Sequence, residues 1–234
     1  MGGTSVYRTL LSVCASLLIC TTANASIVIT GTRVVYPAGD KEVSVKISNK
    51  GRSPVLIQSW LDNGDTKAKP DQIKLPFVLT PPINRVEPDR GQTLRIRALP
   101  NNLPENKESV FWLNVLEIPA KPKDELKDTN NYLQVAFRSR IKFFYRPAGL
   151  KGSPKAAATD LQWSRVGSSL HVKNDSPYHI SLVDVYVNGK KADGKMLAPF
   201  AEDNYALTVS AGSKVKAEYV NDYGAVIPLD ITVQ

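Results

Sequence analysis

Residues of the kinds that carry out covalent or metal chemistry are few in this chain of 234 residues. Its only two cysteines, Cys14 and Cys20, and its only two histidines, His171 and His179, have spacings that do not fit a Cys₂His₂ zinc site. The histidines are expected to have ordinary surface or strand roles. Glycine-rich phosphate loops and serines in a nucleophile-elbow setting are absent from the sequence. The expected chemistry is therefore that of binding, with no catalytic residue, metal site or cofactor, and we do not expect an enzyme.

The segment best suited to binding runs from Tyr132 to Tyr145 without glycine or proline, and is longer than a typical strand of about 5–6 residues. Leu133, Val135 and Phe137 place large apolar side chains at every second position of its first half. A long apolar strand at a sheet edge promotes aggregation unless it is covered or used by a partner. The pattern alone leaves two interpretations open, burial in the protein's own core or insertion into a partner. The second half of the segment is basic, with Arg138, Arg140, Lys142 and Arg146.

The elements that must position this segment are predicted to be short strands. Apolar residues alternate with polar ones at period two in several segments separated by Gly, Pro, Asn and Asp turns, which is typical of all-β sandwiches. Proline and glycine at 147–154 indicate a connector, so we expect two domains, residues 26–148 and 149–234. Trp60, Trp112 and Trp163 lie within strand patterns and are expected in the cores. The clearest alternating segments are residues 43–48, 94–98, 110–116, 133–138 and 183–188.

Residues 1–25 have the form of a secretory signal peptide. A single charge, Arg8, precedes an apolar stretch that is too short for a membrane-spanning helix, and Ala23-Asn24-Ala25 is a typical cleavage pattern. A lipoprotein signal with Cys20 as the lipidated residue is the alternative. Cleavage after Ala25 removes both cysteines, so we expect an exported protein without disulfides, held together by core packing.

The net charge of +8 indicates an acidic partner or an anionic surface. Removal of Arg8 with the leader lowers this charge by one. Nucleic acid is not an expected partner, because no basic module with interleaved aromatic residues is present and because export argues against it.

Several ordered motifs resemble those of one family. They include LPENKESVFWLNVLEIP at 103–119, IKFFYRP at 141–147 and VNDYG at 220–224, together with Thr32-Arg33 in the first strand, Thr80-Pro81-Pro82 and RVEP at 85–88. The whole of residues 26–234 resembles the periplasmic pilus chaperones of the chaperone–usher pathway. The resemblance implies two immunoglobulin-like sandwiches in an L-shaped arrangement and a periplasmic location.

The resemblance also implies a function. Members of this family bind pilus subunits whose immunoglobulin-like fold lacks its last strand, and deliver them to an outer-membrane usher. The inserted strand would be 131–145, with Leu133, Val135 and Phe137 as the donated side chains. Three fully buried large side chains would contribute roughly 5–9 kcal/mol before ordering costs. Free chaperone is expected to self-associate through the same strand.

Five charged residues match positions of known importance in this family. Arg33 and Lys142 correspond to the pair that holds the C-terminal carboxylate of the subunit, although without the resemblance they would be interpreted as solvated surface cations. Glu108, Arg146 and Asp222 correspond to a salt-bridge network that sets the angle between the domains.

The polar stretch 119–131 is predicted to be a loop and resembles that of the short-loop class, since no cysteine remains after cleavage. Two alternatives stay open at this stage. A fibre subunit would normally have a disordered N-terminal extension and a disulfide, and a secreted carbohydrate-binding sandwich would need a carboxylate pair or an aromatic platform.

Overall fold

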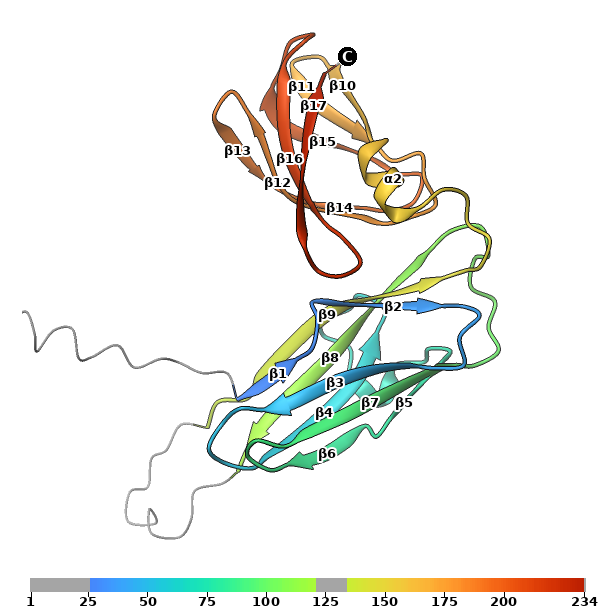
Figure 1. Ribbon diagram of the computed structural model, residues 1–234, viewed down its shortest axis with the longest axis vertical. Coiled ribbons are helices and arrows are strands. Elements are labelled where there is room, and N and C mark those ends of the chain that lie inside the picture. Colours follow the sequence, from blue (N-terminus) through green and yellow to red (C-terminus); the bar gives the residue numbers. More distant parts are fainter. Residues whose placement is uncertain (1–25, 121–133, 234) are drawn as a thin grey trace, which may run out of the picture.

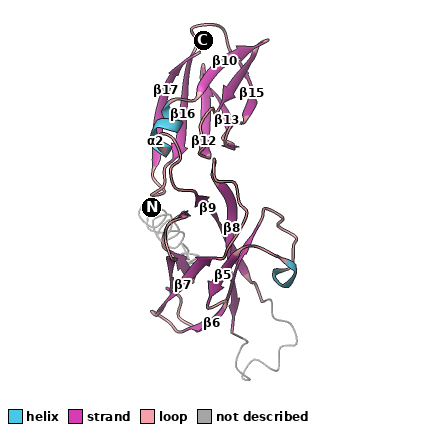
Figure 2. Ribbon diagram, turned by 90° about the vertical axis from the view of Figure 1, so that its right-hand side faces the viewer, coloured by secondary structure: helices cyan, strands magenta, loops and turns pink. Residues whose placement is uncertain are grey.

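Residues 26–120 and 134–233 are described by the computed structural model, and Leu133 lies outside them. The chain forms two β-sandwich lobes set at an angle to each other, which gives the expected L shape (Figures 1 and 2). Alternating polar and apolar residues place one face of each strand in a core and the other in solvent.

Two sheets face each other in the first lobe. One has the strand order β1-β3-β7-β5, and the other has the order β2-β9-β8-β4-β6. A short 3₁₀ helix, η1, spans Pro70–Gln72. The strands are β1 (Ile27–Ile29), β2 (Arg33–Pro37), β3 (Val43–Asn49), β4 (Val55–Asp62), β5 (Phe77–Thr80), β6 (Ile83–Val86), β7 (Gly91–Ala98), β8 (Ser109–Pro119) and β9 (Phe137–Arg146).

The second lobe is also built from two sheets. One has the order β10-β11-β15, and the other has the order β13-β12-β16-β17, with β14 paired to β12. A short helix, α2 (Pro154–Thr159), begins where the Ser153 hydroxyl accepts a hydrogen bond from the Ala156 amide at 3.2 Å. The strands are β10 (Gln162–Val166), β11 (Ser169–Lys173), β12 (Ile180–Val187), β13 (Lys190–Asp193), β14 (Met196–Leu197), β15 (Glu202–Thr208), β16 (Lys214–Val220) and β17 (Val226–Thr232).

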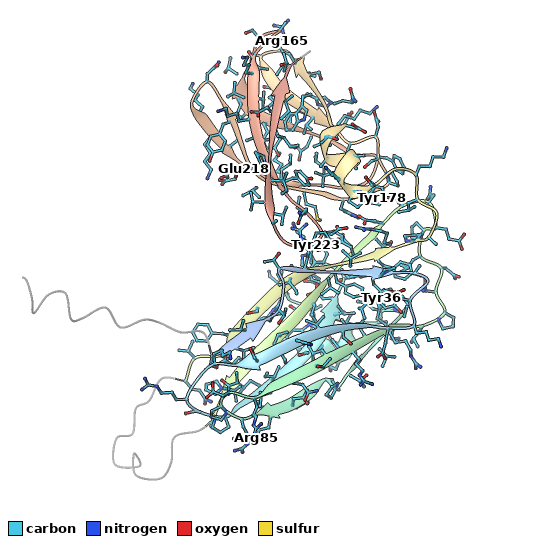
Figure 3. The ribbon with its side chains drawn as sticks, in the orientation of Figure 1. Tyr36, Arg85, Arg165, Tyr178, Glu218 and Tyr223 are labelled. Atoms are coloured by element: carbon cyan, nitrogen blue, oxygen red, sulfur yellow. The ribbon has the colours of Figure 1, made fainter. Side chains whose placement is uncertain are left out.

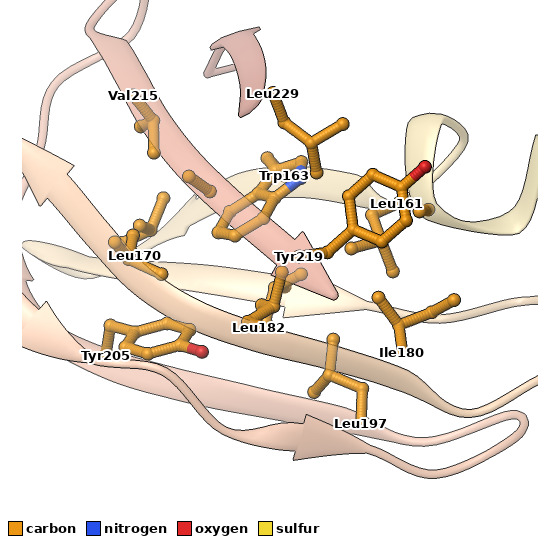
Figure 4. Packing of buried hydrophobic residues seen from close by; sticks show 14 of the residues in the cluster. Leu161, Trp163, Leu170, Ile180, Leu182, Leu197, Tyr205, Val215, Tyr219 and Leu229 are labelled. Carbon is orange, nitrogen blue, oxygen red and sulfur yellow. The ribbon is translucent and has the colours of Figure 1, made fainter. Parts of the chain in front are cut away.

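Each lobe has a hydrophobic core of its own. Ile57, Leu94 and Phe143 are fully buried in the first core, whereas Leu170 and Val185 are fully buried in the second. Figure 4 shows the second core, where Trp163 lies among the leucines as expected. Because each lobe packs around its own centre, each is stabilised independently of the angle between them.

The first strand differs from the expectation. Arg33 does not continue the first described strand, because β1 ends at Ile29 and pairs with β3, whereas β2 pairs with β9 in the opposite sheet. The chain crosses between the sheets at Gly31, whose φ of +96° is readily adopted only by glycine. This crossing places Arg33 beside β9.

The predicted long strand is shorter than expected. It begins at Phe137, which pairs with Glu117 of β8, and residues 134–136 before it are not in a strand. It is also only partly an edge strand, since β2 runs parallel to it from Lys142 onward. Over Phe137–Ile141, β8 is its only partner among the described strands.

Candidate functional site

Arg33 and Lys142 lie side by side at the junction of the lobes. They are register partners in the parallel β2–β9 ladder. The Arg33 Nη1 donates to the carbonyl oxygen of Val220 at 2.7 Å, and the Lys142 Nζ donates to the Ser181 Oγ at 3.0 Å. Arg33 and Lys142, both from the first lobe, therefore contact the second lobe.

The electrostatic environment of this pair favours an anion. Burial lowers the pKa of Arg33, and the charge of Asp222 opposes that shift only in part. Burial and the neighbouring charge of Arg33 together lower the pKa of Lys142 below its ordinary value of 10.5. The Arg33 Nε is buried without a hydrogen-bond partner within the described part of the chain. Two partly desolvated cations and an unpaired donor can bind a carboxylate through charge-assisted hydrogen bonds.

Arg146 joins Glu108 of the first lobe to Asp222 of the second. Its Nε donates to Glu108 at 2.6 Å, and its Nη1 and Nη2 donate to the two Asp222 oxygens at 2.7 and 3.0 Å. Burial would lower the pKa of Arg146, but hydrogen bonds and the charges of Asp222 and Glu108 raise it overall. The Glu108 side chain is only 1% exposed, so this network is largely shielded from water.

His179 also belongs to this junction, which was not expected from the sequence. Its backbone amide donates to Glu108 Oε2 at 2.8 Å, and its Nδ1 lies 3.3 Å from the same oxygen. Its ring packs at a tilt on that of Phe144, with 5.5 Å between the centroids. Residues 71 positions apart meet only in the folded chain, so no spacing in the sequence indicated this contact.

A cavity of about 420 Å³ lies at the junction. Arg33, Arg146 and Asp222 line it together with apolar surface from Ile180 and Ile227. Tyr223 is at its rim, 94% exposed, on the β16–β17 turn that reaches toward the first lobe (Figure 3). A Cβ on Gly224 in the same turn would be 2.6 Å from the Thr32 Oγ1, so the turn is in close contact with the residue that precedes β2.

The two described side chains of the predicted donor set are exposed. Val135 is 46% exposed and Phe137 is 60% exposed. Both have odd numbers, as has Phe143, which is fully buried on the core face of β9. Phe137 therefore continues that face of β9 beyond the end of the core, and Val135 lies two residues before the strand begins. Leu133, the third predicted residue, lies outside the described residues.

The tryptophan prediction was wrong for two of three residues. Trp60 and Trp112 lie half-buried on the outer face of the sheet, because β4 and β8 direct their odd-numbered residues into the core. The guanidinium of Arg138 lies 5.5 Å from the ring centroid of Trp60, and that of Arg140 lies 4.5 Å from the centroid of Trp112.

Residues 26–120 and 134–233 contain no group of three or more His, Cys, Asp or Glu side chains arranged to hold a metal ion. Within those ranges no helix has the length and apolar character needed to cross a membrane.

Comparison with known families gives two matches that together span almost all described residues. Residues 26–151 match the family "Pili and flagellar-assembly chaperone, PapD N-terminal domain". Residues 156–231 match the family "Pili assembly chaperone PapD, C-terminal domain". The first match alone covers more than half of the chain.

Individual relatives agree. The chaperone protein FimB/FhaD of Bordetella pertussis is 45% identical over 220 residues, which are 90% of this chain and 89% of that protein. The CupB2 chaperone structure of Pseudomonas aeruginosa superposes with a TM-score of 0.75 at 37% identity, covering 88% of this chain and all of that one. A Salmonella enterica complex of the SafA pilin with the SafB chaperone contains a chain with a TM-score of 0.78 at 27% identity, covering 91% and 98%.

These matches extend over both lobes and agree with the two-sandwich architecture. The family is one of chaperones, which is not an enzyme class. The chain belongs to the pilus-assembly chaperone family represented by PapD.

Proposed function

We propose that this protein is a periplasmic chaperone that binds, folds and caps pilus subunits and hands them to an outer-membrane usher. Its relatives carry the name of fimbrial chaperone, and one solved relative is in complex with a pilin. These relatives support the chaperone function and not the fibre-subunit or carbohydrate-binding alternative. The proposal includes a non-enzymatic action, export through a cleaved signal peptide and a domain boundary between residues 148 and 149.

The observation that carries the proposal is the position of the open edge of β9 next to the two cations. Phe137–Ile141 offer backbone groups on one side, and Lys142 follows directly in the same strand. An extended subunit segment added to this edge would pair its backbone with β9, and its terminal carboxylate would be held at Arg33 and Lys142. The carboxylate would thus fix the register of the added strand.

The donated side chains in this proposal are Leu133, Val135 and Phe137. If this segment is extended in the complex, alternation at period two would direct all three toward the same side. In a subunit that lacks its last strand, they would fill the groove from which that strand is missing. The free energy of subunit binding would then come from burying apolar surface and pairing the strand, without any nucleotide.

Glu108, Arg146 and Asp222 would hold the two lobes at the angle that shapes the cleft. A carboxylate as deeply buried as that of Glu108 needs its guanidinium partner, so the network resists separation of the lobes. Its role here is to support the cleft, while Arg33 and Lys142 contact the subunit.

Co-purification from periplasm tests the proposal. The chain is expressed with a candidate fibre subunit encoded by a neighbouring gene, as wild type and as Arg33→Ala, Lys142→Ala and Arg85→Ala. Arg85 is an exposed arginine on β6, at the far edge of the same sheet, and serves as the matched control. We expect a one-to-one complex that survives Arg85→Ala and is lost, with degradation of the subunit, in the other two variants.

Other results would be equally informative. A complex unaffected by Arg33→Ala and Lys142→Ala would retain the chaperone function and contradict the carboxylate anchor. No complex with any fibre subunit, from a well-folded wild-type protein, would contradict the function itself.

A further inference from the structure

The first half of β9 is held from its outer face instead of from its free edge. Residues 137–141 have only β8 beside them among the described strands, so a strand pair that frays easily is expected here. The outward side chains of this half are Arg138 and Arg140, since alternation sends Phe137 and Ile141 toward the core side.

Arg140 reaches across β8 to a buried carboxylate on β4. Its Nε and Nη2 donate to the Asp62 oxygens at 3.1 and 2.5 Å. Asp62 is 1% exposed and also accepts hydrogen bonds from the Asn114 Nδ2 and the Gly64 amide, each at 2.7 Å. Because β8 lies between β9 and β4, this ion pair spans three strands.

Trp112 forms the floor of this contact. The Arg140 guanidinium lies over its ring, 4.5 Å from the centroid, and Gly64 in the loop after β4 also lies close to the ring. A Cβ on Gly64, whose φ is +113°, would be 3.2 Å from the Trp112 ring. The planar guanidinium is thus confined by the ring and by the bidentate carboxylate, an arrangement for which arginine is better suited than lysine.

Arg138 repeats the arrangement one step closer to the exposed Phe137. Through Leu116 of β8, Arg138 is in register with Gln58 of β4. Its guanidinium instead lies over Trp60, two residues further along β4, at 5.5 Å from the ring centroid. Its Nη1 donates to the Thr66 carbonyl oxygen at 3.1 Å. Both arginines therefore lean the same way, toward β4 and the loop that follows it.

The electrostatics of Asp62 agree with a firmly held pair. Burial would raise the pKa of its carboxyl group, but hydrogen bonds from Arg140, Asn114 and Gly64 lower it overall. The carboxylate therefore stays ionised in the neutral range, and the pair remains intact there.

We propose that the Asp62–Arg140 pair and its Trp112 floor act as a clamp that positions the first half of β9 for strand addition. The clamp holds the strand through its outward side chains, so its free edge keeps every backbone donor and acceptor available for the subunit. The role of the clamp in subunit capture rests on the proposed chaperone function. Asp62 and Arg140 are positioning residues and do not touch the subunit themselves.

Hydrogen exchange followed by mass spectrometry tests the clamp in the free protein, whatever the partner is. We expect amides of residues 137–141 to exchange about tenfold faster in Asp62→Asn than in wild type, while β3 and β7 keep their protection. Arg140→Lys retains the charge but not the bidentate geometry, and we expect an intermediate increase. Arg85→Gln on β6 breaks the exposed pair of Arg85 with Glu87 and is the control, for which we expect no change in β9.

Subunit association gives the second measurement. With the fibre subunit described above as the probe, we expect Asp62→Asn and Arg140→Lys to slow association about tenfold and about threefold, with the melting temperature used to correct for global stability. If Asp62→Asn does not fold, Arg140→Lys alone decides the question.

Failure of the clamp and failure of the chaperone function can be told apart. Equal acceleration of exchange in β3, β7 and β9 would mean that Asp62 serves general stability, and would overturn the clamp. Unchanged exchange in β9 would overturn it as well. Absence of any wild-type complex would contradict the chaperone function and leave the exchange result to decide on the clamp in the free protein.

Discussion

Phe137 and Phe143 lie on the same face of β9, yet Phe143 is fully buried and Phe137 is 60% exposed. They are six positions apart, an even number, so alternation directs both toward the core side. Phe143 packs against Phe77, with 5.1 Å between the ring centroids, and against Tyr36 at 6.0 Å. The core does not extend as far as Phe137, at the start of β9. One strand thus contributes to folding at one end and, in our proposal, to partner binding at the other.

The two phenylalanines should therefore respond differently to the same substitution. We expect Phe143→Ala to lower the free energy of unfolding by about 3–5 kcal/mol, because it leaves a cavity in the core. We expect Phe137→Ala to leave stability within about 0.5 kcal/mol of wild type and to weaken subunit binding. Urea unfolding and titration with the subunit measure the two effects. A large loss of stability in Phe137→Ala would contradict the donor assignment.

Alkaline pH should weaken the subunit complex through Lys142. Because its pKa in the folded protein is below 10.5, it loses its proton at a lower pH than an ordinary lysine. Binding of a carboxylate needs the protonated amine, so we expect the dissociation constant to rise as pH increases toward that lowered pKa. Lys142→Arg, which stays charged, should bind with less pH dependence when both variants are titrated in parallel.

The stability of the free protein should change in the opposite direction. A lysine with a lowered folded-state pKa releases its proton in the folded chain before the unfolded chain does. Between the two pKa values the unfolded state binds more protons, so stability rises with pH in that window. Thermal melts of wild type and Lys142→Ala at several alkaline pH values measure this contribution, and identical pH profiles would contradict it.

Removing Arg146 should be more damaging than removing Asp222. Arg146→Ala would leave the buried Glu108 carboxylate without its guanidinium, at a cost of about 3–5 kcal/mol. Asp222 is 32% exposed in its side chain, and its loss leaves the Arg146–Glu108 contact in place, so we expect about 1–3 kcal/mol. Calorimetry measures stability, and small-angle scattering measures the angle between lobes. Equal stability of the two variants would mean that losing the Arg146–Glu108 contact costs nothing beyond the loss of the Arg146–Asp222 contact, and would contradict this prediction.

Free chaperone should self-associate through the open edge of β9. An exposed strand with unpaired backbone groups and an apolar residue such as Phe137 is a template for pairing with a second copy. We expect gel filtration to show a dimer that grows with concentration and is weakened by Phe137→Lys. A strict monomer at high concentration would rule out this self-association.

Alternation and turn residues were sufficient to predict the class of fold. Val183, Val185 and Val187 alternate with polar residues and form part of β12, and Asn188-Gly189 makes the tight turn to β13 with positive φ at both positions. Such features depend on neighbours in the chain, which is why the sequence alone predicts them well.

The site depended more on contacts between distant residues. The crossing of the chain at Gly31, the ion pair of Asp62 with Arg140 and the contact of His179 with Glu108 join segments whose proximity no local pattern indicates. The length of β9 was also overestimated, because alternation continues through residues 134–136, where the structure has no strand paired with β8.

The sequence by itself determined two all-β lobes, the apolar alternation before β9 and, through its motifs, the family. The tertiary structure decided which face each strand buries, where the edge of β9 is open, and which charges meet. The physical reason is the range of the interactions. Period-two alternation is imposed by the backbone of a single strand, whereas burial, edge pairing and charge contacts depend on the packing of segments far apart in the sequence, such as Arg33 and Val220, which are 187 residues apart.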